Sequence, residues 1–374
     1  MAEPSPKRVA VVLPPREGFG PQSAGAIALL QARLATPDPA VPSGFAVTIV
    51  GAKQRGTVFP LPYLPAEERW SLWGSDARYA AAVARVLDRL QPDLIEIHNR
   101  PDLARRLARR FPPRRIALFL HNDPRAMRGA RTAAARAALS GTLGAVICVS
   151  RVLADCWLEG TRAAAGPAPR VLPNSLDLSA LPAPLPPAAR DRTIVFAGRV
   201  VADKGADSFV AACAEALPHL PGWQAVMIGA DRFRPDSPET PFTESLRDRA
   251  EHAGIARLGY RDHAAVMTAL SKAAIAMVPS RWQEPFGLAA LEAMAAGAAL
   301  VTSGRGGLGE LASGASVVID PDDVSGIAAA LIQLAHDPAR RAALSQAGLD
   351  RARAYDLPEA RRRLDALRME LLTS

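Results

Sequence analysis

Cysteine and histidine are scarce in this chain of 374 residues. Cys148, Cys156 and Cys213 form no Cys-x2-Cys pair, so we expect buried, reduced thiols. The six histidines are scattered and include no His-x3-His pair. We therefore expect neither a metal nor a cofactor.

Long hydrophobic runs are also absent. No apolar run approaches the roughly 20 residues of a membrane-spanning helix. Residues 9–13 form a short apolar run near the N-terminus, too short for a signal-peptide core and typical of a buried first strand. We expect a cytoplasmic protein. Apolar residues still make up 49% of the chain, and its length exceeds what one core usually supports, which predicts two domains.

Lysine is rare, and the charge is uneven. The chain has four lysines and a net charge of +8; residues 1–189 hold 24 cations and 14 anions, a net charge of +10. Residues 100–136 alone contain 11 arginines and two acids. Such a segment favours an anionic partner, for example a membrane surface. Few aromatic residues accompany the arginines, so nucleic acid is disfavoured. An ordinary solvated helix is the alternative interpretation.

Strand-like apolar runs alternate with amphipathic helical stretches throughout, which predicts an α/β fold with parallel sheets. The stretch LPAPLPPAAR at 181–190 has no period and is interpreted as a linker. We expect two Rossmann-like, doubly wound domains that face a cleft, with ligands beyond the carboxyl ends of the strands. The predicted divisions are a first domain at 1–182, a linker at 183–190, a second domain at 191–355 and a last helix at 356–374.

The segment TIVFAGRVVADKGAD at 193–207 predicts an anion site. A strand ends at Gly198, and Arg199 and Lys204 flank a short loop before Gly205 and a helix. Two cations beside helix-start amides suit a diphosphate. A solvated turn is the alternative.

The segment PSRWQEPFGLAALEAMAAG at 279–297 holds two glutamates eight positions apart. We expect Pro285 in the first turn of a helix. Glu284 then lies at the helix mouth and Glu292 two turns further along, so the two carboxylates share a side of the helix but not a position. They suit two hydroxyl-bearing groups of one elongated ligand, with amides meeting its anionic centre. These amides are expected to be those of Phe286, Gly287 and Leu288.

The glycines of SGRGGLGE at 303–310 satisfy Gly-x-Gly-x2-Gly. Only five residues separate this loop from the next strand, too few for the crossover helix of a dinucleotide-binding fingerprint. A dehydrogenase is therefore disfavoured, and the glycines are expected to let the loop approach a ligand.

In the first half, REGFGPQSAGAIALL at 16–30 follows the first strand, and Gly25 could place helix-start amides near a phosphate. Glu17 lies in the same loop. His98 and His121 each follow a strand, in IEIHNRP and LFLHNDP. A lone histidine is more often structural, but two at equivalent strand ends favour a functional role. We include Glu17, His98 and Asn99 as candidate acceptor-side residues.

In order and spacing, GRVVADKG, PSRWQEPFGLAALEAMAAG and SGRGGLGEL resemble the retaining glycosyltransferases of family 4, which have the GT-B fold and a Glu-x7-Glu motif. The HNRP and HNDP blocks look like members that act in bacterial cell-surface polysaccharide synthesis. The resemblance implies several roles in donor binding and catalysis. Arg199 and Lys204 would hold the donor diphosphate, Glu292 the ribose and Glu284 the transferred sugar; Gly198, Phe286, Gly287 and Leu288 would line the donor site, His121 would lie near the reacting sugar, and Gly25 would approach the phosphate.

Two positions depart from the family pattern. Ala24 stands where many members have the first glycine of a pair, and Ser175 replaces the glycine of the usual Asn-Gly after Asn174. Neither change removes a charge. The family's last helix often returns to the first domain, so 356–374 is expected to do so here.

The sequence therefore predicts a metal-independent, retaining glycosyltransferase that moves a sugar from a nucleoside-diphosphate sugar to a saccharide or lipid-linked acceptor. Its expected setting is lipopolysaccharide or exopolysaccharide synthesis at the inner face of the plasma membrane, with 100–136 against anionic lipid. A sugar-nucleotide epimerase of the same fold and a non-catalytic sugar-nucleotide-binding protein are the alternatives.

Overall fold

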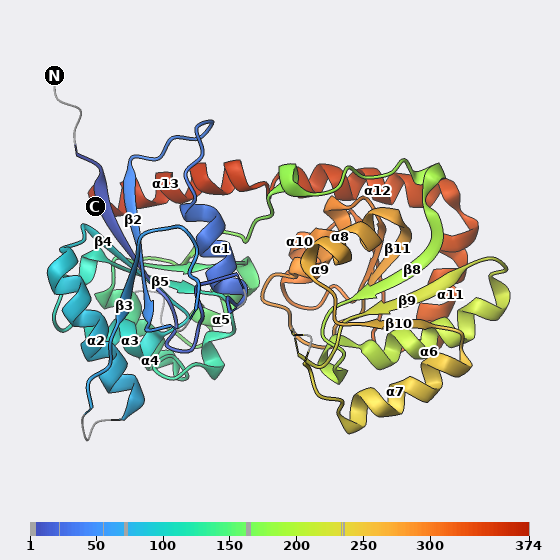
Figure 1. The fold of residues 1–374 in the computed structure, drawn as a ribbon, viewed down its shortest axis with the longest axis horizontal. Helices are drawn as coiled ribbons and strands as arrows, with labels where there is room; N and C mark the ends of the chain where they lie inside the picture. The colour runs from blue at the N-terminus through green and yellow to red at the C-terminus, as the bar shows by residue number, and fades with distance from the viewer. Residues whose placement is uncertain are drawn as a thin grey trace. The chain divides into compact units, whose positions relative to one another are not determined.

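Two parallel sheets organise the chain (Figure 1). The computed structural model describes residues 5–21, 23–54, 56–70, 74–161, 166–232, 234 and 236–373. It divides into unit 1, Met1–Ser175 with Leu357–Ser374, and unit 2, Leu176–Asp356. Residues 1–4 of the predicted first domain and residue 374 of the predicted last helix lie outside the described residues. Within these residues, every helix is either too short or too polar to span a bilayer.

The sheet of unit 1 has seven strands in the order β3-β2-β1-β4-β5-β6-β7, and its neighbours pair in parallel. The apolar runs of the first half form β1, β2, β4, β5 and β6 as predicted. The sequence pattern missed β3 and β7 because they are short and only partly buried. The bounds are β1 Lys7–Val12, β2 Phe45–Ala52, β3 Tyr63–Ala66, β4 Leu94–His98, β5 Ile116–Leu120, β6 Ala145–Cys148 and β7 Arg170–Val171.

Helices cover both faces of this sheet. Side chains of α1 and α13 join β1, β2, β5 and β6 in apolar clusters on one face. On the other, α2 packs on β1, β2 and β3, α3 packs on β4 and β5, and α4 packs on α5. The parallel α/β organisation predicted from the alternation of apolar runs is thus confirmed. The bounds are α1 Ala26–Ala35, α2 Ser75–Leu90, α3 Pro101–Leu107, α4 Ala133–Thr142, α5 Arg151–Leu158 and α13 Leu357–Thr373.

Helix α13 follows unit 2 in the chain but packs on unit 1. Its Arg368 donates two hydrogen bonds, of 2.8 and 2.9 Å, to the carboxylate of Glu96 on β4. Both side chains are buried, so each charge depends on the other. Arg361 pairs with Asp38 and donates to a main-chain carbonyl of α1. The helix is therefore held by a buried ion pair as well as by its leucines.

The sheet of unit 2 has six strands in the order β10-β9-β8-β11-β12-β13. This order is that of the doubly wound dinucleotide-binding fold, and all neighbours are parallel. The bounds are β8 Asp191–Ala197, β9 Gln224–Ile228, β10 Ala256–Gly259, β11 Ala273–Val278, β12 Ala299–Thr302 and β13 Ser316–Val318.

In unit 2, α6, α7 and α11 build the main apolar core against one face of the sheet, and α8, α9 and α12 cover the other (Figure 1). The predicted linker packs against this unit, because the guanidinium of Arg190 donates to the carbonyls of Leu185, Ala273 and Ala296. The helices are α6 Ala206–Ala216, α7 Pro241–His252, α8 His263–Lys272, α9 Leu288–Ala295, α10 Gly307–Leu311, α11 Val324–His336 and α12 Pro338–Arg353.

The strand orders locate the crevice of each sheet. The order changes direction between β1 and β4 in unit 1 and between β8 and β11 in unit 2. Ligands of doubly wound sheets bind outside the carboxyl ends of the strands at such a switch point. The loops that follow β8 and β11 hold Lys204 and Glu284, and those that follow β1 and β4 hold Glu17 and Asn99.

Candidate functional site

Two loops meet at the switch point of unit 2. The loop after β8 ends in a short 3-10 turn, Ala202–Lys204, and a left-handed Gly205 (φ 67°) that begins α6. The carbonyl of Asp203 accepts hydrogen bonds from the main-chain amides of Arg281 (2.9 Å) and Trp282 (3.0 Å) in the loop after β11. The two loops thus fix each other's backbone.

Lys204 and Glu284 form an ion pair between these loops. The same carboxylate oxygen, Oε1 of Glu284, accepts a hydrogen bond of 2.7 Å from the hydroxyl of Ser280. Glu284 is only 8% exposed, and a carboxylate at that depth requires such partners. The Lys204 ammonium remains partly accessible. The ion pair therefore holds the Lys204 cation at the crevice against a buried, hydrogen-bonded carboxylate.

Arg281 secures the same two loops from outside. Its guanidinium donates to Asp207 at 2.6 Å, to Ser208 at 2.8 Å and to the carbonyl of Ala202 at 2.9 Å. It also pairs with Asp322. Hydrogen bonds to Asp207 are the main reason that the pKa of Arg281 is raised. This network holds the turn that carries Lys204.

Helix α9 begins later than the sequence predicts. Pro285 was expected in its first turn, but the helix begins at Leu288 with Gly287 as its N-cap. Gly287 has a φ of 104°, and a Cβ there would lie 2.4 Å from Leu308, so a side chain is excluded on both grounds. The expectation about Pro285 was wrong because the left-handed glycine resets the chain direction. Among the described residues, the amides of Phe286, Gly287 and Leu288 donate to no main-chain or side-chain acceptor.

The glycine loop at 303–310 contacts protein backbone. A Cβ on Gly306 would lie 2.5 Å from the Glu284 carbonyl, and the amide of Gly307 donates to that carbonyl at 2.6 Å. Gly306 and Gly307 thus let the loop support the Glu284 turn, and the loop then continues into the short helix α10. Approach of the loop to a ligand stays a prediction.

Glu292 lies in the second turn of α9 and binds a different partner from Glu284. Its Oε1 lies 2.9 Å from Nε2 of His263, the first residue of α8. The two carboxylates thus occupy separate positions, as their spacing predicts. Arg199, at the end of β8, is part-buried and has no ion-pair partner among the described residues. It remains a candidate cation for an anionic ligand, beside Gly198.

In unit 1, Glu17 and Gly25 lie together. Gly25 is the N-cap of α1, and the Glu17 carboxylate accepts a hydrogen bond of 3.2 Å from the amide of Ala28 in the first turn. A Cβ on Gly25 would lie 2.5 Å from the same carboxylate. A phosphate at this helix start would therefore have to displace Glu17.

The structure brings His98 and His121 into direct contact. Parallel pairing of β4 and β5 sets His98 beside Phe119, two residues before His121. Nδ1 of His98 lies 2.9 Å from Nε2 of His121, and the rings stack. Asn99, at a left-handed φ of 57°, accepts a hydrogen bond of 2.8 Å from the main-chain amide of His121.

Burial sets the charge of both imidazoles. Desolvation lowers the pKa of His121 to about 4, with the Asn174 side chain acting in the opposite direction. The pKa of His98 falls well below its usual value, first through burial and then through His121 and Arg368. Both rings are neutral at pH 7. Because His98 is only 1% exposed, any role in binding an acceptor would pass through His121.

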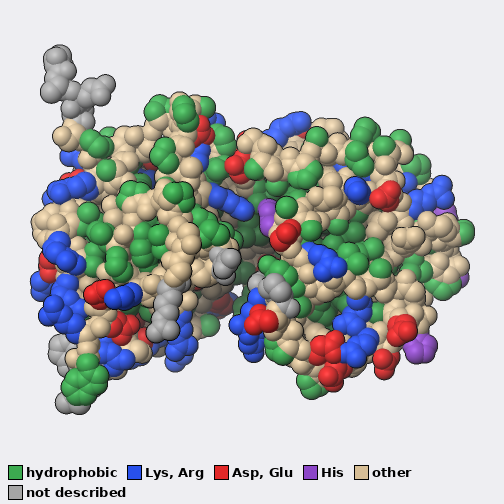
Figure 2. Space-filling view, viewed as in Figure 1, with side chains coloured by type: hydrophobic (Ala, Val, Ile, Leu, Met, Phe, Trp, Pro, Cys, Tyr) green, Lys and Arg blue, Asp and Glu red, His purple; other side chains and the backbone are tan. Residues whose placement is uncertain are grey.

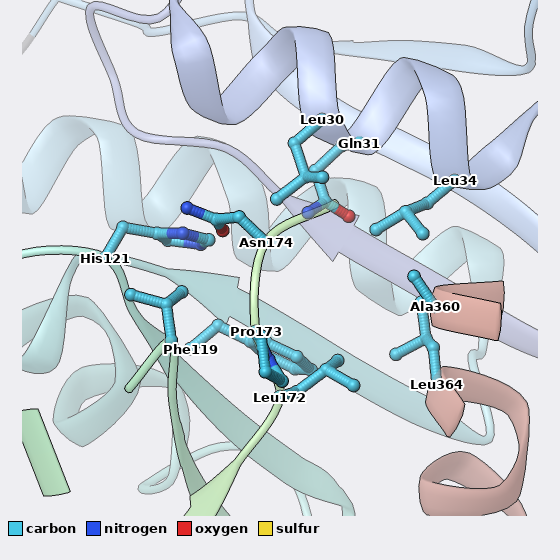
Figure 3. A pocket seen from close by; sticks show the side chains of 11 residues that line it. Leu30, Gln31, Leu34, Phe119, His121, Leu172, Pro173, Asn174, Ala360 and Leu364 are labelled. Atoms are coloured by element: carbon cyan, nitrogen blue, oxygen red, sulfur yellow. The ribbon is translucent and has the colours of Figure 1, made fainter. Parts of the chain in front are cut away.

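A small cavity adjoins this pair (Figure 3). Its volume is about 20 Å³, room for about one water-sized group. Its apolar lining comes from α1, α13, β5 and the segments after β6 and β7, and Gln31, His121 and Asn174 supply its polar atoms. The buried Oδ1 of Asn174 has no hydrogen-bond partner among the described residues. Ser175 has ordinary backbone geometry, since Gln91 and Asn99 are the non-glycine residues described with positive φ.

The arginines of 100–136 divide into structural and free ones. Arg136 is buried and donates to the carbonyls of Trp157 and Ala130. Five others pair with nearby carboxylates: Arg105 and Arg106 with Asp102, Arg110 with Asp88, Arg125 with Asp123 and Glu159, and Arg128 with Asp76. Arg109, Arg115 and Arg131 are exposed and have no ion-pair partner among the described residues. Figure 2 shows many basic side chains on the surface of unit 1.

Comparison with known families identifies the second unit. Residues 180–351 match the family described as glycosyl transferases group 1 and belong to it. The chain is 34% identical over 176 residues to a glycogen synthase of Mycobacterium tuberculosis, covering 45% of this chain and 40% of that protein. It is 34% identical over 160 residues to the lipopolysaccharide core biosynthesis mannosyltransferase LpsB of Rhizobium meliloti, covering 41% and 44%. The matches thus span less than half the length of these relatives.

Solved structures show the GT-B fold over the whole chain. A sucrose-phosphate synthase from Thermosynechococcus elongatus superposes with a TM-score of 0.76 at 22% identity, covering 98% of this chain and 100% of that one. HepE of Anabaena, solved in complex with UDP and glucose, gives 0.72 at 16% identity, covering 97% and 99%. The predicted GT-B fold is therefore confirmed over the chain, and the predicted family over residues 180–351.

Sequence reasoning missed three residues that support the site. Ser280 and Arg281 lie in the quoted Glu-x7-Glu segment, but serine and arginine are common and no spacing rule marks them. His263 follows Asp262, whose side chain caps α8, and only the packing of α8 beside α9 brings it to Glu292.

Proposed function

We propose that the chain is a metal-independent, retaining glycosyltransferase. It would transfer a sugar from a nucleoside-diphosphate sugar to a saccharide or lipid-linked acceptor in bacterial cell-surface polysaccharide synthesis. The observation that supports this most is the arrangement of Lys204, Glu284 and Glu292 at the switch point of a unit from the group 1 family. Cation, helix amides and two separated carboxylates match the chemistry of such a donor.

Each part of the donor has a candidate partner. The diphosphate would bind Lys204, Arg199 and the unpaired amides at the start of α9. Glu292 would exchange His263 for the ribose hydroxyls, and Glu284 would accept hydrogen bonds from the transferred sugar. Because Glu284 is buried and tied to Ser280, its carboxylate is already oriented.

Catalysis would depend on charge stabilisation. Negative charge grows on the leaving diphosphate as the sugar becomes oxocarbenium-like, and preplaced cations and amides stabilise it without reorganisation. Lys204 and Arg199 would do here what a divalent cation does in some other transferases. With retention, the departing phosphate would assist deprotonation of the acceptor, and Glu284 would not form a covalent intermediate. His121 would lie beside the reacting sugar.

The acceptor would be presented at an anionic membrane surface. A groove of about 270 Å³ between α3 and α4 has an alanine-rich floor with Arg105 and Arg109 at its edge. With Arg115 and Arg131, the unpaired Arg109 would form a basic face that suits lipid headgroups. We therefore propose that the protein acts at the inner face of the plasma membrane.

Incubation with labelled sugar nucleotides tests the proposal. HepE was solved with UDP-glucose, and a relative from Corynebacterium glutamicum is a GDP-mannose-dependent mannosyltransferase, so UDP-glucose and GDP-mannose are the first donors to use. Label transferred to a saccharide or lipid acceptor, with the anomeric configuration kept, supports the proposal. An epimerised donor would indicate the epimerase, and binding without turnover the non-catalytic protein.

A further inference from the structure

The contact between His98 and His121 indicates which ring nitrogen of each histidine carries the proton. We infer that His98 is a positioning residue that fixes the tautomer of His121. His98 donates from Nδ1 to Nε2 of His121, so that His121 carries its own proton on Nδ1, on the side of Asn174. The importance of this for transfer rests on the proposed function, but the tautomer itself does not.

Both rings are neutral, so each carries a single N–H. Burial lowers the pKa of each imidazole. The charged groups packed against His98 are His121 and the Arg368 guanidinium, and Arg368 is itself neutralised by Glu96. In the 2.9 Å contact between Nδ1 of His98 and Nε2 of His121, one ring must donate and the other accept.

The second nitrogen of His98 decides the direction. Nε2 of His98 is buried and has no partner among the described residues. Orphaned buried N–H groups are rarer than under-satisfied acceptors, so this nitrogen is the one without hydrogen. The proton of His98 is then on Nδ1 and points to His121. Since Nε2 of His121 accepts it, the proton of His121 is on Nδ1.

The pair is held rigidly enough to maintain this tautomer. The ring of His98 stacks on Phe119 with centroids 4.8 Å apart, and Asn99 holds the main-chain amide of His121. Figure 3 shows His121 and Asn174 side by side at the polar end of the cavity. An N–H on Nδ1 makes His121 a hydrogen-bond donor and not a base; under the proposed function, the acceptor would be an oxygen of the reacting sugar.

Three substitutions of His98 separate this role from packing. His98→Asn keeps an amide N–H near the Nδ1 position and should preserve the hydrogen bond to Nε2 of His121. His98→Gln has the same amide one methylene further along, near the Nε2 position, and His98→Phe keeps a ring without any donor. Both should remove the hydrogen bond to Nε2 of His121. Near-ultraviolet circular dichroism identifies the variants that fold. If His98→Phe does not fold, the test rests on His98→Gln.

Nitrogen-15 NMR of the histidine-labelled full chain reads the tautomer directly. We expect His121 to be protonated on Nδ1 in the parent and in His98→Asn, and to shift to the Nε2–H form in His98→Gln and His98→Phe. A parent protonated on Nε2, or a tautomer unchanged in the last two variants, would overturn the inference.

Kinetics with a donor that the parent accepts provide a second readout. Loss of one oriented hydrogen bond should lower kcat about tenfold in His98→Gln and His98→Phe, with little change in the donor KM and with recovery in His98→Asn. Equal losses in all three variants would contradict the positioning role. If the parent transfers no sugar from any donor, the proposed function fails while the NMR result still decides the tautomer.

Discussion

Lys204 and Glu284, 80 positions apart in the chain, form an ion pair that joins the two loops at the switch point of the second sheet. Ser280 completes the pair by donating to the same carboxylate oxygen. Under the proposed function, this pair would supply both a cation for a diphosphate and an oriented carboxylate for a sugar, and the first two predictions depend on it.

Replacing Lys204 should abolish most turnover. Lys204→Ala removes the cation expected to stabilise the leaving diphosphate, and loss of one such group typically costs about 100- to 1,000-fold in kcat. The measurement is initial rate at saturating donor. Lys272→Ala is the matched control, because Lys272 is exposed at the end of α8 and should leave the rate unchanged. A normal rate in Lys204→Ala would refute its role.

Substitutions of Glu284 and Glu292 should have different effects on binding and turnover. Glu292→Gln should weaken binding of the nucleoside diphosphate about tenfold, because an amide accepts ribose hydroxyls less strongly than a carboxylate. Glu284→Gln should mainly lower turnover and sugar affinity. Calorimetric titration with UDP and with UDP-glucose compares them, and the exposed Glu251→Gln serves as the control. If neither change alters binding, the assignment of both glutamates is wrong.

Breaking the buried ion pair of α13 should destabilise unit 1. Arg368→Met leaves the Glu96 carboxylate buried without a partner, a change that typically costs about 3–5 kcal/mol. Urea unfolding of the full chain measures the loss. Arg362→Met on the same helix removes an exposed pair with Glu359 and should cost at most about 1 kcal/mol.

The double variant Glu96→Gln/Arg368→Met refines this test. It removes both charges, so it should be more stable than Arg368→Met alone. Equal stability of the two would show that the lost guanidinium packing, and not the unpaired carboxylate, dominates.

Acid should destabilise unit 1 through its histidine pair. The pKa of His121 is lowered from 6.5 to about 4, so the unfolded chain binds more protons between these values. This stabilisation is complete above pH 6.5 and is lost as the pH falls towards 4, with a magnitude of about 2–3 kcal/mol. Urea unfolding at pH 7, 6 and 5 should show a shallower fall in His98→Phe/His121→Phe than in the parent. The surface change His219→Gln should not alter the slope.

Partition to anionic vesicles should depend on the free arginines of unit 1. Changing Arg109, Arg115 and Arg131 to Gln should weaken binding to vesicles rich in phosphatidylserine about 100-fold, at about 1 kcal/mol for each charge. A control with equal charge loss in unit 2 changes Arg192, Arg261 and Arg340 to Gln. Partition that is insensitive to salt, or equally weakened by the control, would contradict an electrostatic docking face on unit 1.

The sequence by itself determined the parallel α/β organisation and the neighbourhood of the donor site. Apolar runs alternating with helical periods are local signals, and parallel strands bring their carboxyl ends to one edge. Lys204 and Glu284 each follow a strand, so their proximity was predictable once those strands were neighbours. The start of α9 was missed because Pro285 is a local helix-start signal, whereas the left-handed φ of Gly287, which delays the helix to Leu288, is seen only in the folded chain.

Only the tertiary structure decided which side chains meet. Lys204 with Glu284, His263 with Glu292 and His98 with His121 depend on strand register and helix packing. The pair of Arg368 and Glu96 spans 272 positions, and no periodicity indicates it. Side-chain pairing depends on distances of a few ångströms, whereas sequence patterns define only the face and the end of an element. Burial, which makes the pair of Arg368 and Glu96 obligatory and keeps both histidines neutral, exists only after the layers have packed.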